Sequence, residues 1–484
     1  MKKSLLLLLL LSAQILVAQN AVQTAVNSFI NYDNFKNASI SICVKDLSSG
    51  ETIAEHQKLL ALPPASTVKL FSTASAFEIL GYDYRPTTSF YTDGQVAQNG
   101  VISGNLYIKG GGDPSLGSKY FNADGKQNIF LREWVHELIR LGVRKIDGKI
   151  IVDGSSFGYE GCPEGWTWGD MGNYYGAGPS GIVLRDNMLI YYFKTAEVGS
   201  LSTLLRTEPE IDGLHFMNNV KAAKQSGDES YIFGAPFSYE RFAVGTLPYG
   251  RREFIVKGSL PDPEYQLAKE FYEMVVSQHI EVEGFDYARN YLIQNIALPN
   301  YKKLTLLKKW EGKTIEEITH HTNMKSVNLF AEQLVCLIGH EKTGVGTTEK
   351  GLKEMTKYWS NKFDISGLNL KDGSGLSRSN SVSSKNFCDL LFEMSKSPKY
   401  SIFKTSLPTA GQTGTLINVC KGQNGEGRVF AKSGTMSRIK SYAGYVKSRS
   451  GKDLAFAIIV NNYNCSNATT VDKIETIMNE MAIY

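Results

Sequence analysis

The chain has 484 residues, 42% hydrophobic and 21% charged, so it is long enough for a large buried core and two to four domains. The formal net charge is +4, of which Lys2 and Lys3 contribute two units. A balance this close to neutrality argues against nucleic acid or an anionic membrane surface as the main partner.

The N-terminus has the pattern of a secretory signal peptide. Two lysines precede an unbroken apolar run, and small or modest residues end that run near Ala18 and Gln19. We therefore predict a signal peptide over residues 1–19 and export of the rest. The apolar run is short for a membrane span, and no second run of spanning length follows, so we expect no stable membrane span in the mature chain. In a two-membrane cell the destination is the periplasm, with peripheral membrane association left open.

The first part of the mature chain predicts a short helix, two strands and a second helix. Residues 21–30 suit a helix, and residues 38–47 alternate apolar and polar side chains as a half-buried strand does. Ser48–Gly50 suits the turn into a return strand at residues 51–54. A helix over residues 65–80 is expected after two prolines that suit its first turn.

The middle of the chain has a different pattern of predicted secondary structure from both ends. From about residue 90 to 295, short β-like runs alternate with glycine-rich turns, interrupted by one amphipathic helix near residues 129–141. Helical patterns return after Thr314. The C-terminal part predicts a closing helix after three successive strands, at residues 427–432, 441–446 and 454–461. This layout indicates one domain built from both chain ends, with a large insertion inside it.

The first candidate catalytic pair is Ser66 and Lys69, at the start of the predicted helix. Residues three apart share a helix face, so the two side chains are neighbours. A serine hydroxyl needs a base to become a good nucleophile, and a lysine with a depressed pKa supplies one. Alone, this SxxK motif is weak, because an N-cap serine followed by a surface lysine is far commoner.

A second motif, Ser326-Val327-Asn328, lies at a later helix start. There the hydroxyl can pass a proton to a leaving nitrogen, and the amide can hold a substrate carbonyl. Ordinary helix capping explains the motif equally well when it is taken alone.

The third motif is Lys432-Ser433-Gly434-Thr435, at the end of a predicted strand. Its lysine and hydroxyls suit a substrate carboxylate, and the glycine admits a close approach of the substrate to the backbone. The backbone N–H groups of Thr435 and Ser66 can form an oxyanion hole.

The order of these motifs is much more specific than any one of them. SxxK, SxN and K[ST]G in this order are the set shared by penicillin-binding proteins and β-lactamases. With Ser326 257 positions after Lys69, the chain resembles the DD-carboxypeptidase/endopeptidases of the penicillin-binding protein 4 type, the low-molecular-mass class C proteins. Further matching segments are Gly104–Ile108, Gly110–Pro114, Asp153–Ser155, Asp372–Arg378 and Gly414–Leu416.

The resemblance implies an α/β (α+β) serine β-lactamase/transpeptidase-like domain with two nested, β-rich inserted domains. The catalytic domain would use residues 20–90 and 295–484. Inserted domain II would use residues 91–112 and 195–294, and domain III, nested within it, residues 113–194.

The resemblance also implies residue roles in peptidoglycan hydrolysis. Ser66 would be acylated, Lys69 would be its base and Ser326 the proton relay. Asn328 would bind a substrate amide, and Lys432 with Ser433 would bind the terminal carboxylate.

A second group of residues would bind the diamino-acid side chain of the stem peptide. Asp170 would meet its ammonium group and Arg378 a carboxylate, while Tyr175, Met436 and Ser437 would line the same pocket. Either Trp166 or Trp168 fits the tryptophan of this pocket, and Ser433 replaces the family's usual threonine with the hydroxyl kept.

The implied partners are peptidoglycan stem peptides, their cross-links and β-lactam antibiotics, and no cofactor or metal is expected. Six scattered cysteines form no CxxC pair, and the adjacent His320 and His321 do not share a helix face. Three alternatives remain open: a serine β-lactamase, an esterase on the same scaffold, and a non-catalytic peptidoglycan-binding protein. A β-lactamase is disfavoured by the lack of an ExxLN segment, and a non-catalytic protein by the presence of both Ser66 and Lys69.

Overall fold

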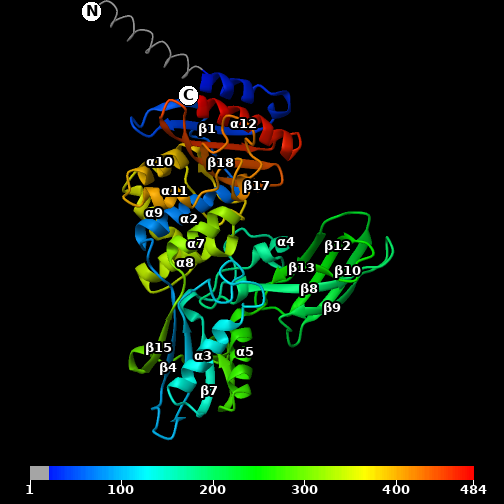
Figure 1. The fold of residues 1–484 in the computed structure, drawn as a ribbon, viewed down its shortest axis with the longest axis vertical. Coiled ribbons are helices and arrows are strands. Elements are labelled where there is room, and N and C mark those ends of the chain that lie inside the picture. The colour runs from blue at the N-terminus through cyan, green and yellow to red at the C-terminus, as the bar shows by residue number, and fades with distance from the viewer. Residues whose placement is uncertain (1–20) are drawn as a thin grey trace, which may run out of the picture. The chain divides into compact units, whose positions relative to one another are not determined.

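The computed structural model describes residues 21–484, which divide into two compact units (Figure 1). The first unit contains the chain up to Tyr82, Thr319–Val327 and Leu352–Tyr484. The second contains Asp83–Ile318 and Asn328–Gly351. The predicted signal peptide lies outside the described residues.

A five-stranded antiparallel sheet from both chain ends forms the centre of the first unit. Its order is β17-β18-β19-β1-β2, so an N-terminal strand pairs with the last strand of the chain, Ile42 opposite Ile458. Figure 1 shows the blue and red ends of the chain side by side here. The strands are β1 (Ser39–Asp46), β2 (Thr52–His56), β17 (Val429–Met436), β18 (Ile439–Lys447) and β19 (Asp453–Asn461).

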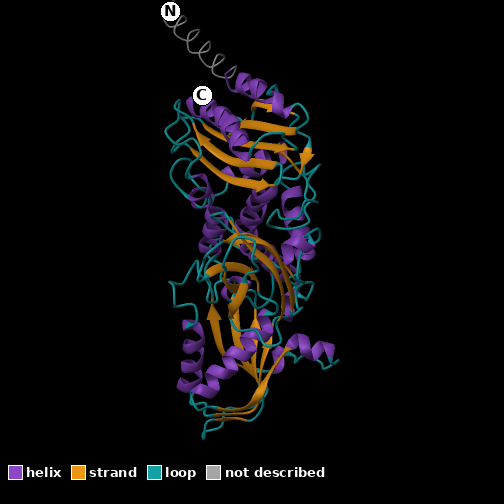
Figure 2. Cartoon of the chain, turned by 90° about the vertical axis from the view of Figure 1, so that its right-hand side faces the viewer, coloured by secondary structure: helices purple, strands orange, loops and turns teal. Residues whose placement is uncertain are grey.

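Helices cover both faces of this sheet (Figure 2). Ile42 and its even-numbered neighbours pack against α12 (Asn467–Ile483) and the helical residues 21–30. The opposite face meets α10 (Ser384–Ser395), where the Ser41 hydroxyl donates to Ser384 Oγ at 2.9 Å. The first strand was predicted to expose its polar face to solvent. That prediction is wrong at Ser41, which is fully buried.

Other helices of the first unit carry or adjoin the catalytic motifs. The predicted helix at 65–80 divides into a 3-10 turn and an α-helix, and the SxN motif follows α7. These elements are η2 (Ala65–Val68), α2 (Lys69–Ile79), α7 (Ile315–Lys325), α9 (Thr348–Ser360), α11 (Tyr400–Thr405) and η7 (Gly414–Leu416), with a two-stranded pair of β3 (Ala61–Leu62) and β16 (Val382–Ser383).

The second unit contains a six-stranded mixed sheet. Its main path is β14-β7-β6-β4-β15, and β5 adds to β7. Helices α3 and α5 pack with this sheet around Phe90, Trp134 and Phe271, whose rings lie within 5.8 Å of one another. The elements are β4 (Thr87–Thr92), β5 (Val101–Ile102), β6 (Leu106–Gly110), α3 (Ile129–Arg140), β7 (Lys145–Asp153), α5 (Pro263–Ser277), β14 (Glu281–Tyr287), α6 (Ala288–Ile293) and β15 (Thr305–Glu311).

Two three-stranded sheets complete the second unit. Their orders are β13-β8-β9 and β10-β12-β11, and the second contains a parallel pair, β10 with β12. The strands are β8 (Met188–Lys194), β9 (Thr203–Glu208), β10 (His215–Ala223), β11 (Glu229–Phe233), β12 (Glu240–Pro248) and β13 (Phe254–Ser259). The β-rich middle of the chain thus has three sheets, while its division into domains II and III stays a prediction.

The six cysteines are unpaired thiols, four of them buried. Within residues 21–484, no helix is both long enough and apolar enough to cross a membrane.

Candidate active site

Ser66 and Lys69 are in direct contact at the junction of η2 and α2. Lys69 Nζ lies 3.0 Å from Ser66 Oγ and donates to the Ser374 carbonyl at 2.6 Å. The lysine is fully buried. Ala65, just before the serine, has a φ of +49°, a left-handed conformation that non-glycine residues seldom adopt. Such strain is often stored at functional sites, and here it turns the chain into the helix that carries both side chains.

A second serine–lysine pair joins the other two motifs. Lys432 Nζ lies 2.9 Å from Ser326 Oγ and 2.7 Å from the Ser433 carbonyl oxygen. Ser326 stands between α7 and α8 (Asn328–Thr343) with a φ of +58°. Lys432 is fully buried on β17, and burial holds its pKa well below its usual value, helped by the nearby ammonium group of Lys69. The two pairs therefore form one site.

Lys440 adds a third cation to this region. It lies opposite Thr435 on β18, and its Nζ donates to Thr435 Oγ1 at 2.8 Å. Burial lowers the pKa of Lys440 to about 8. Buried ammonium groups gathered at one place create a positive potential, which favours a substrate carboxylate.

The KSGT motif lies within β17, not at the end of a strand as predicted. The strand continues to Met436 because Ser433, Gly434 and Thr435 pair with Tyr442, Ser441 and Lys440 on β18. β17 is also an edge strand of this sheet. Residues 408–410 bond its outer side at Val429 and Ala431, so the stretch from Lys432 onward is the part that can meet an extended ligand.

Gly434 allows β17 to approach the serine helix closely. A β-carbon at this position would lie 2.5 Å from the Pro64 carbonyl oxygen and 3.0 Å from the Ser66 nitrogen. No larger residue fits there without moving one of these segments. The strand backbone next to Gly434 is thus held beside the backbone N–H of Ser66.

The loop that begins at Asp372 supports Lys69. The Asp372 carboxylate accepts hydrogen bonds from the backbone N–H of Gly375 at 2.8 Å and of Ser377 at 2.6 Å. This network fixes the Ser374 carbonyl that receives the Lys69 ammonium. The segment is recognisable in the sequence, but the role of Ser374 is not, since a backbone contact leaves no signal in a side-chain pattern.

Three predicted pocket residues of the first unit lie at its surface. Arg378 is exposed, and within the described chain its guanidinium has no hydrogen-bond or ion-pair partner. Met436 is half-buried at the end of β17, and Ser437 is exposed in the turn that follows.

The other three predicted residues come together in the second unit. Asn328 opens α8, and its Nδ2 donates to the Tyr175 carbonyl at 2.8 Å. Burial raises the pKa of Tyr175 to about 12, with a further contribution from the negative charge of Asp170. Asp170, on α4 (Trp168–Met171), accepts from the Thr167 backbone N–H and hydroxyl at 3.1 and 2.6 Å.

The two candidate tryptophans have different environments. Trp166 is buried, with 6% of its surface exposed, whereas Trp168 is 55% exposed and lies beside Phe233 with ring centroids 6.0 Å apart. Trp168 is therefore the tryptophan that can meet a ligand without rearrangement.

Comparisons with known proteins identify the family and the fold of this chain. The D-Ala-D-Ala carboxypeptidase 3 (S13) family matches residues 22–482. A D-alanyl-D-alanine carboxypeptidase of Actinomadura sp. (strain R39) is 28% identical, covering 91% of this chain and 80% of its own. Carboxypeptidase DacB of Haemophilus influenzae is 23% identical, covering 90% and 88%.

The crystal structure of penicillin binding protein 4 (dacB) from Haemophilus influenzae has the same fold. Its TM-score is 0.79 at 20% identity, over 95% of this chain and 99% of that one. The described residues contain no group of three or more histidine, cysteine, aspartate or glutamate side chains arranged to hold a metal ion.

The fold is that of the serine β-lactamase/transpeptidase-like enzymes, with additional sheets inserted. Within that class, the chain belongs to the D-Ala-D-Ala carboxypeptidase 3 (S13) family, and it is a serine-type carboxypeptidase, a hydrolase.

Proposed function

We propose that the protein hydrolyses the D-alanyl-D-alanine end and the cross-links of peptidoglycan stem peptides through an acyl-enzyme on Ser66. The observation that carries this proposal is the 3.0 Å contact between Lys69 Nζ and Ser66 Oγ. It places a buried amine within proton-transfer reach of a hydroxyl at a helix start.

Acylation would begin when the neutral amine of Lys69 takes the proton of Ser66. The serine oxygen attacks the carbonyl carbon of the penultimate D-alanine, and the oxyanion is held by the N–H groups of Ser66 and Thr435. These two segments are kept together by the close approach at Gly434. Collapse of this intermediate breaks the carbon–nitrogen bond, and the leaving amine must gain a proton.

Ser326 and Lys432 are suited to supply that proton. Their 2.9 Å contact lets the lysine donate to the serine oxygen while the serine hydroxyl proton moves to the leaving nitrogen. Water then attacks the ester carbonyl and gives a proton through Ser326 to the neutral Lys432. Lys69 returns its proton to the Ser66 oxygen as the shortened peptide leaves, so Ser66 and both lysines regain their starting states. The terminal carboxylate of the substrate would meet Lys432 and the Ser433 hydroxyl, which bonds Thr415 Oγ1 at 2.9 Å.

Asp170, Tyr175 and Asn328 would bind the rest of the stem peptide. Asp170 is half-buried and carries the negative charge that a side-chain ammonium requires. Arg378, Met436 and Ser437 are accessible residues of the first unit, and we propose that they too bind the diamino-acid side chain. We also propose that the second unit contains domains II and III.

Relatives support cleavage of cross-links and reaction with β-lactams. A solved structure of penicillin binding protein 4 from Haemophilus influenzae contains a β-lactam, with a TM-score of 0.73 at 19% identity, over 93% of this chain and 97% of that one. Another, with a TM-score of 0.50 at 16% identity over 92% and 93%, is a predatory endopeptidase from Bdellovibrio bacteriovorus. The cell envelope, reached by export, is where such substrates occur.

Labelling with a fluorescent penicillin tests the acyl-enzyme. The wild-type protein should gain one covalent adduct, and Ser66→Ala should gain none, with the neighbouring Ser72→Ala protein as a matched control. Ser72 is also buried on α2 but donates to the Gly373 carbonyl. An adduct that persists in Ser66→Ala would overturn the assignment of the nucleophile.

Product analysis then separates the alternatives. Release of D-alanine from a muropeptide pentapeptide supports the carboxypeptidase, and cleavage of cross-linked dimers supports the endopeptidase. Rapid turnover of nitrocefin without either product would indicate a β-lactamase. Binding of peptidoglycan with no adduct and no product would indicate a non-catalytic protein.

A further inference from the structure

A cavity of about 540 Å³ lies within the second unit, apart from the residues of the proposed mechanism. Its size falls in the range of roughly 300–1,000 Å³ that is usual for ligand sites. Lys119, Met188, Glu208, Glu210, Lys269 and Glu273 contribute to its wall. Charges of both signs and one thioether therefore face the same space.

Within residues 21–484, the Lys119 ammonium on this wall makes no salt bridge. The lysine is half-buried, and its Nζ lies 3.8 Å from the Met188 sulfur, a weak acceptor. The nearby carboxylate of Asp186 is already bonded by the Ser118 hydroxyl at 2.6 Å and by the backbone N–H of Lys119. Burial lowers the pKa of Lys119, and the charge of Asp186 opposes this shift only in part. An anion in the cavity would stabilise the ammonium further.

The carboxylates on the wall make fewer hydrogen bonds and ion pairs than the buried carboxylates of this unit. Within residues 21–484, the exposed Glu210 side chain has no hydrogen-bond or ion-pair partner. Glu273 reaches Lys269 only at 4.0 Å, because that lysine is held by Asp212 at 2.6 Å. Glu208 accepts a single hydrogen bond, from Tyr192. These carboxylates can receive an ammonium group.

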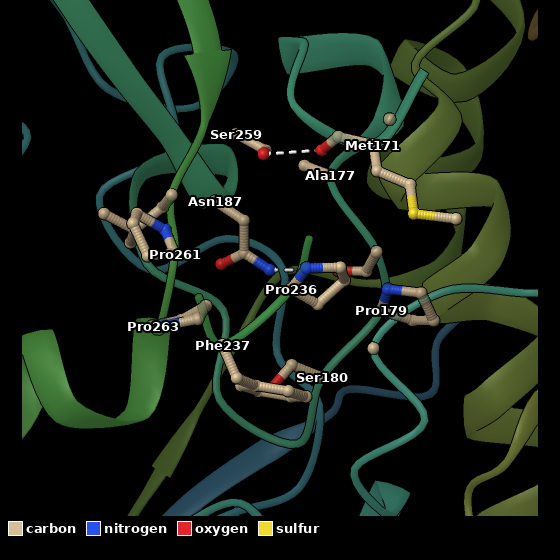
Figure 3. Close-up of a pocket in the computed structure, with 14 residues that line it drawn as sticks. Met171, Ala177, Pro179, Ser180, Asn187, Pro236, Phe237, Ser259, Pro261 and Pro263 are labelled. Carbon is tan, nitrogen blue, oxygen red and sulfur yellow. Dashed lines mark hydrogen bonds between the residues drawn. The ribbon is translucent and has the colours of Figure 1, made fainter. Parts of the chain in front are cut away.

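A strained turn at residues 185–187 contributes to the same wall as Lys119. Arg185, Asp186 and Asn187 have φ values of +47°, +61° and +48°, three successive left-handed residues none of which is glycine. An ion pair from Arg185 to Glu270 fixes one end of this turn. At the other end, Asn187 Nδ2 donates to the Gly178 carbonyl at 3.2 Å, beside a hollow of only about 30 Å³ (Figure 3). Strain maintained in this way is typical of binding sites.

Lys119 is also near the segment that contains Tyr175. Its Nζ lies 6.0 Å from the ring of Tyr174, and that ring lies 5.6 Å from the ring of Tyr175. The neighbouring Tyr120 packs against Phe330, two residues after Asn328. One aromatic ring, that of Tyr174, therefore separates Lys119 from Tyr175, which is proposed to hold the stem peptide.

We infer that this cavity is a second binding site for zwitterionic peptides of the stem-peptide class, with a peptide carboxylate on Lys119 and an ammonium group on Glu210 and Glu273. The identity of the ligand rests on the proposed function, because stem peptides carry several carboxylates and free amines. Two adjacent peptide sites would allow the enzyme to hold both strands of a cross-link.

Calorimetry on the penicillin-treated protein tests this site. Benzylpenicillin would acylate Ser66, and the background substitution Asp170→Ala, present in every protein of this experiment, would close the diamino-acid part of the first site. The probe is the tripeptide L-Ala-γ-D-Glu-meso-diaminopimelate. We expect residual binding of one tripeptide, weakened at least about tenfold by Lys119→Met, as for loss of a charge-assisted hydrogen bond. Lys257→Met is the matched control, because Lys257 is an exposed lysine whose charge acts on Lys119 and which does not contribute to the cavity wall. It should bind within about twofold of wild type.

An amidated peptide and a Glu210 variant test the two ends of the proposed ligand separately. Amidation of the tripeptide carboxylates should remove the difference between the wild-type and Lys119→Met proteins, and Glu210→Gln should weaken binding at the opposite end. Glu210 is exposed, so its variant serves if Lys119→Met fails to fold. Acylated protein that binds no tripeptide, or a Lys119→Met protein that binds as wild type, would overturn the inference. Failure of acylation would instead refute the proposed function, and the two lysine variants would still test the cavity.

Discussion

Lys432 Nζ lies 2.9 Å from Ser326 Oγ, so two residues 106 positions apart in the chain form one hydrogen-bonded pair. Lys432→Met should reduce the second-order rate of penicillin acylation by about 10- to 100-fold, because a charge-assisted hydrogen bond worth about 1.5–3 kcal/mol is lost. Stopped-flow acylation measures the effect. An unchanged rate would exclude Lys432 from carboxylate binding and from proton transfer.

The pH dependence of acylation should show the depressed pKa of Lys432. Its ammonium binds carboxylate only while protonated, so affinity is present below the folded-state pKa and is lost as pH rises through it. Burial and Lys69 lower that pKa, which places the loss below the ordinary lysine value of 10.5. Lys432→Arg keeps its charge at every accessible pH, and its alkaline limb should shift upward. Coincident alkaline limbs would show that another group controls this part of the profile.

A methyl group at Gly434 should impair acylation. The added β-carbon of Gly434→Ala would meet the Pro64 carbonyl oxygen and the Ser66 nitrogen, so β17 or η2 must move. A displacement near 1 Å costs about 100-fold in rate when it misplaces reacting groups. Gly227→Ala is the control, because nothing lies within 4 Å of its added carbon. Equal acylation by both variants would contradict the close approach.

Asp170 should affect peptide substrates more than penicillin. Asp170→Ala removes a charge proposed to meet the diamino-acid ammonium, and kcat/KM for a tripeptide-derived substrate should fall at least about tenfold. Penicillin acylation should change by less than threefold, roughly the range of a surface substitution. Asp228→Ala is matched, since Asp228 also accepts a backbone N–H and a hydroxyl, both from Ser230. Equal losses on both substrates would show that Asp170 has no part in specificity.

Glu264 should make the second unit less stable in alkali. Burial raises its pKa from 4.5 to about 8, so the folded state holds a proton that the unfolded state releases. Stability is therefore lost as pH rises between these values. Glu264→Gln keeps the acceptor for Gly154 N–H and should raise the free energy of unfolding at pH 9 by about 5 kcal/mol more than at pH 4. Urea unfolding measures both values.

Glu229→Gln provides the comparison for Glu264, because Glu229 is exposed on β11. Its effect on unfolding should be the same at the two pH values. A Glu264→Gln protein with no pH-dependent gain would show that the buried carboxyl is compensated by its hydrogen bonds.

Local patterns predicted the elements that carry the catalytic motifs. Alternation over residues 38–47 corresponds to β1, and the closing strands correspond to β17, β18 and β19. The extension of β17 through Gly434 was missed, because glycine and serine disfavour strands locally while pairing with β18 overrides that preference. The polar face of β1 was misjudged for a similar reason, since its cover comes from α10, more than 300 residues later.

The contacts within the site could not be predicted from the sequence, because many of them involve backbone groups. The order of the motifs predicted that Ser66, Lys69, Ser326 and Lys432 share one site. No sequence pattern relates Lys69 to the carbonyl of Ser374. Backbone acceptors and long-range pairs depend on the folded path of the chain. The binding role of Lys119 was not predicted from the sequence. It depends on the absence of a salt bridge to this lysine within residues 21–484, which only three-dimensional packing reveals.

The pairing of β1 with β19 also determines when the enzyme can exist. Ser39 is opposite Asn461, so the central sheet closes only after almost the whole chain has been synthesised. Contacts this distant in sequence form late and slowly. A partly synthesised chain has Ser66 and Lys69 but lacks β17 with Lys432. A cell making this hydrolase would therefore hold no active form of it until each molecule is nearly complete, and a product truncated before β17 would be inactive.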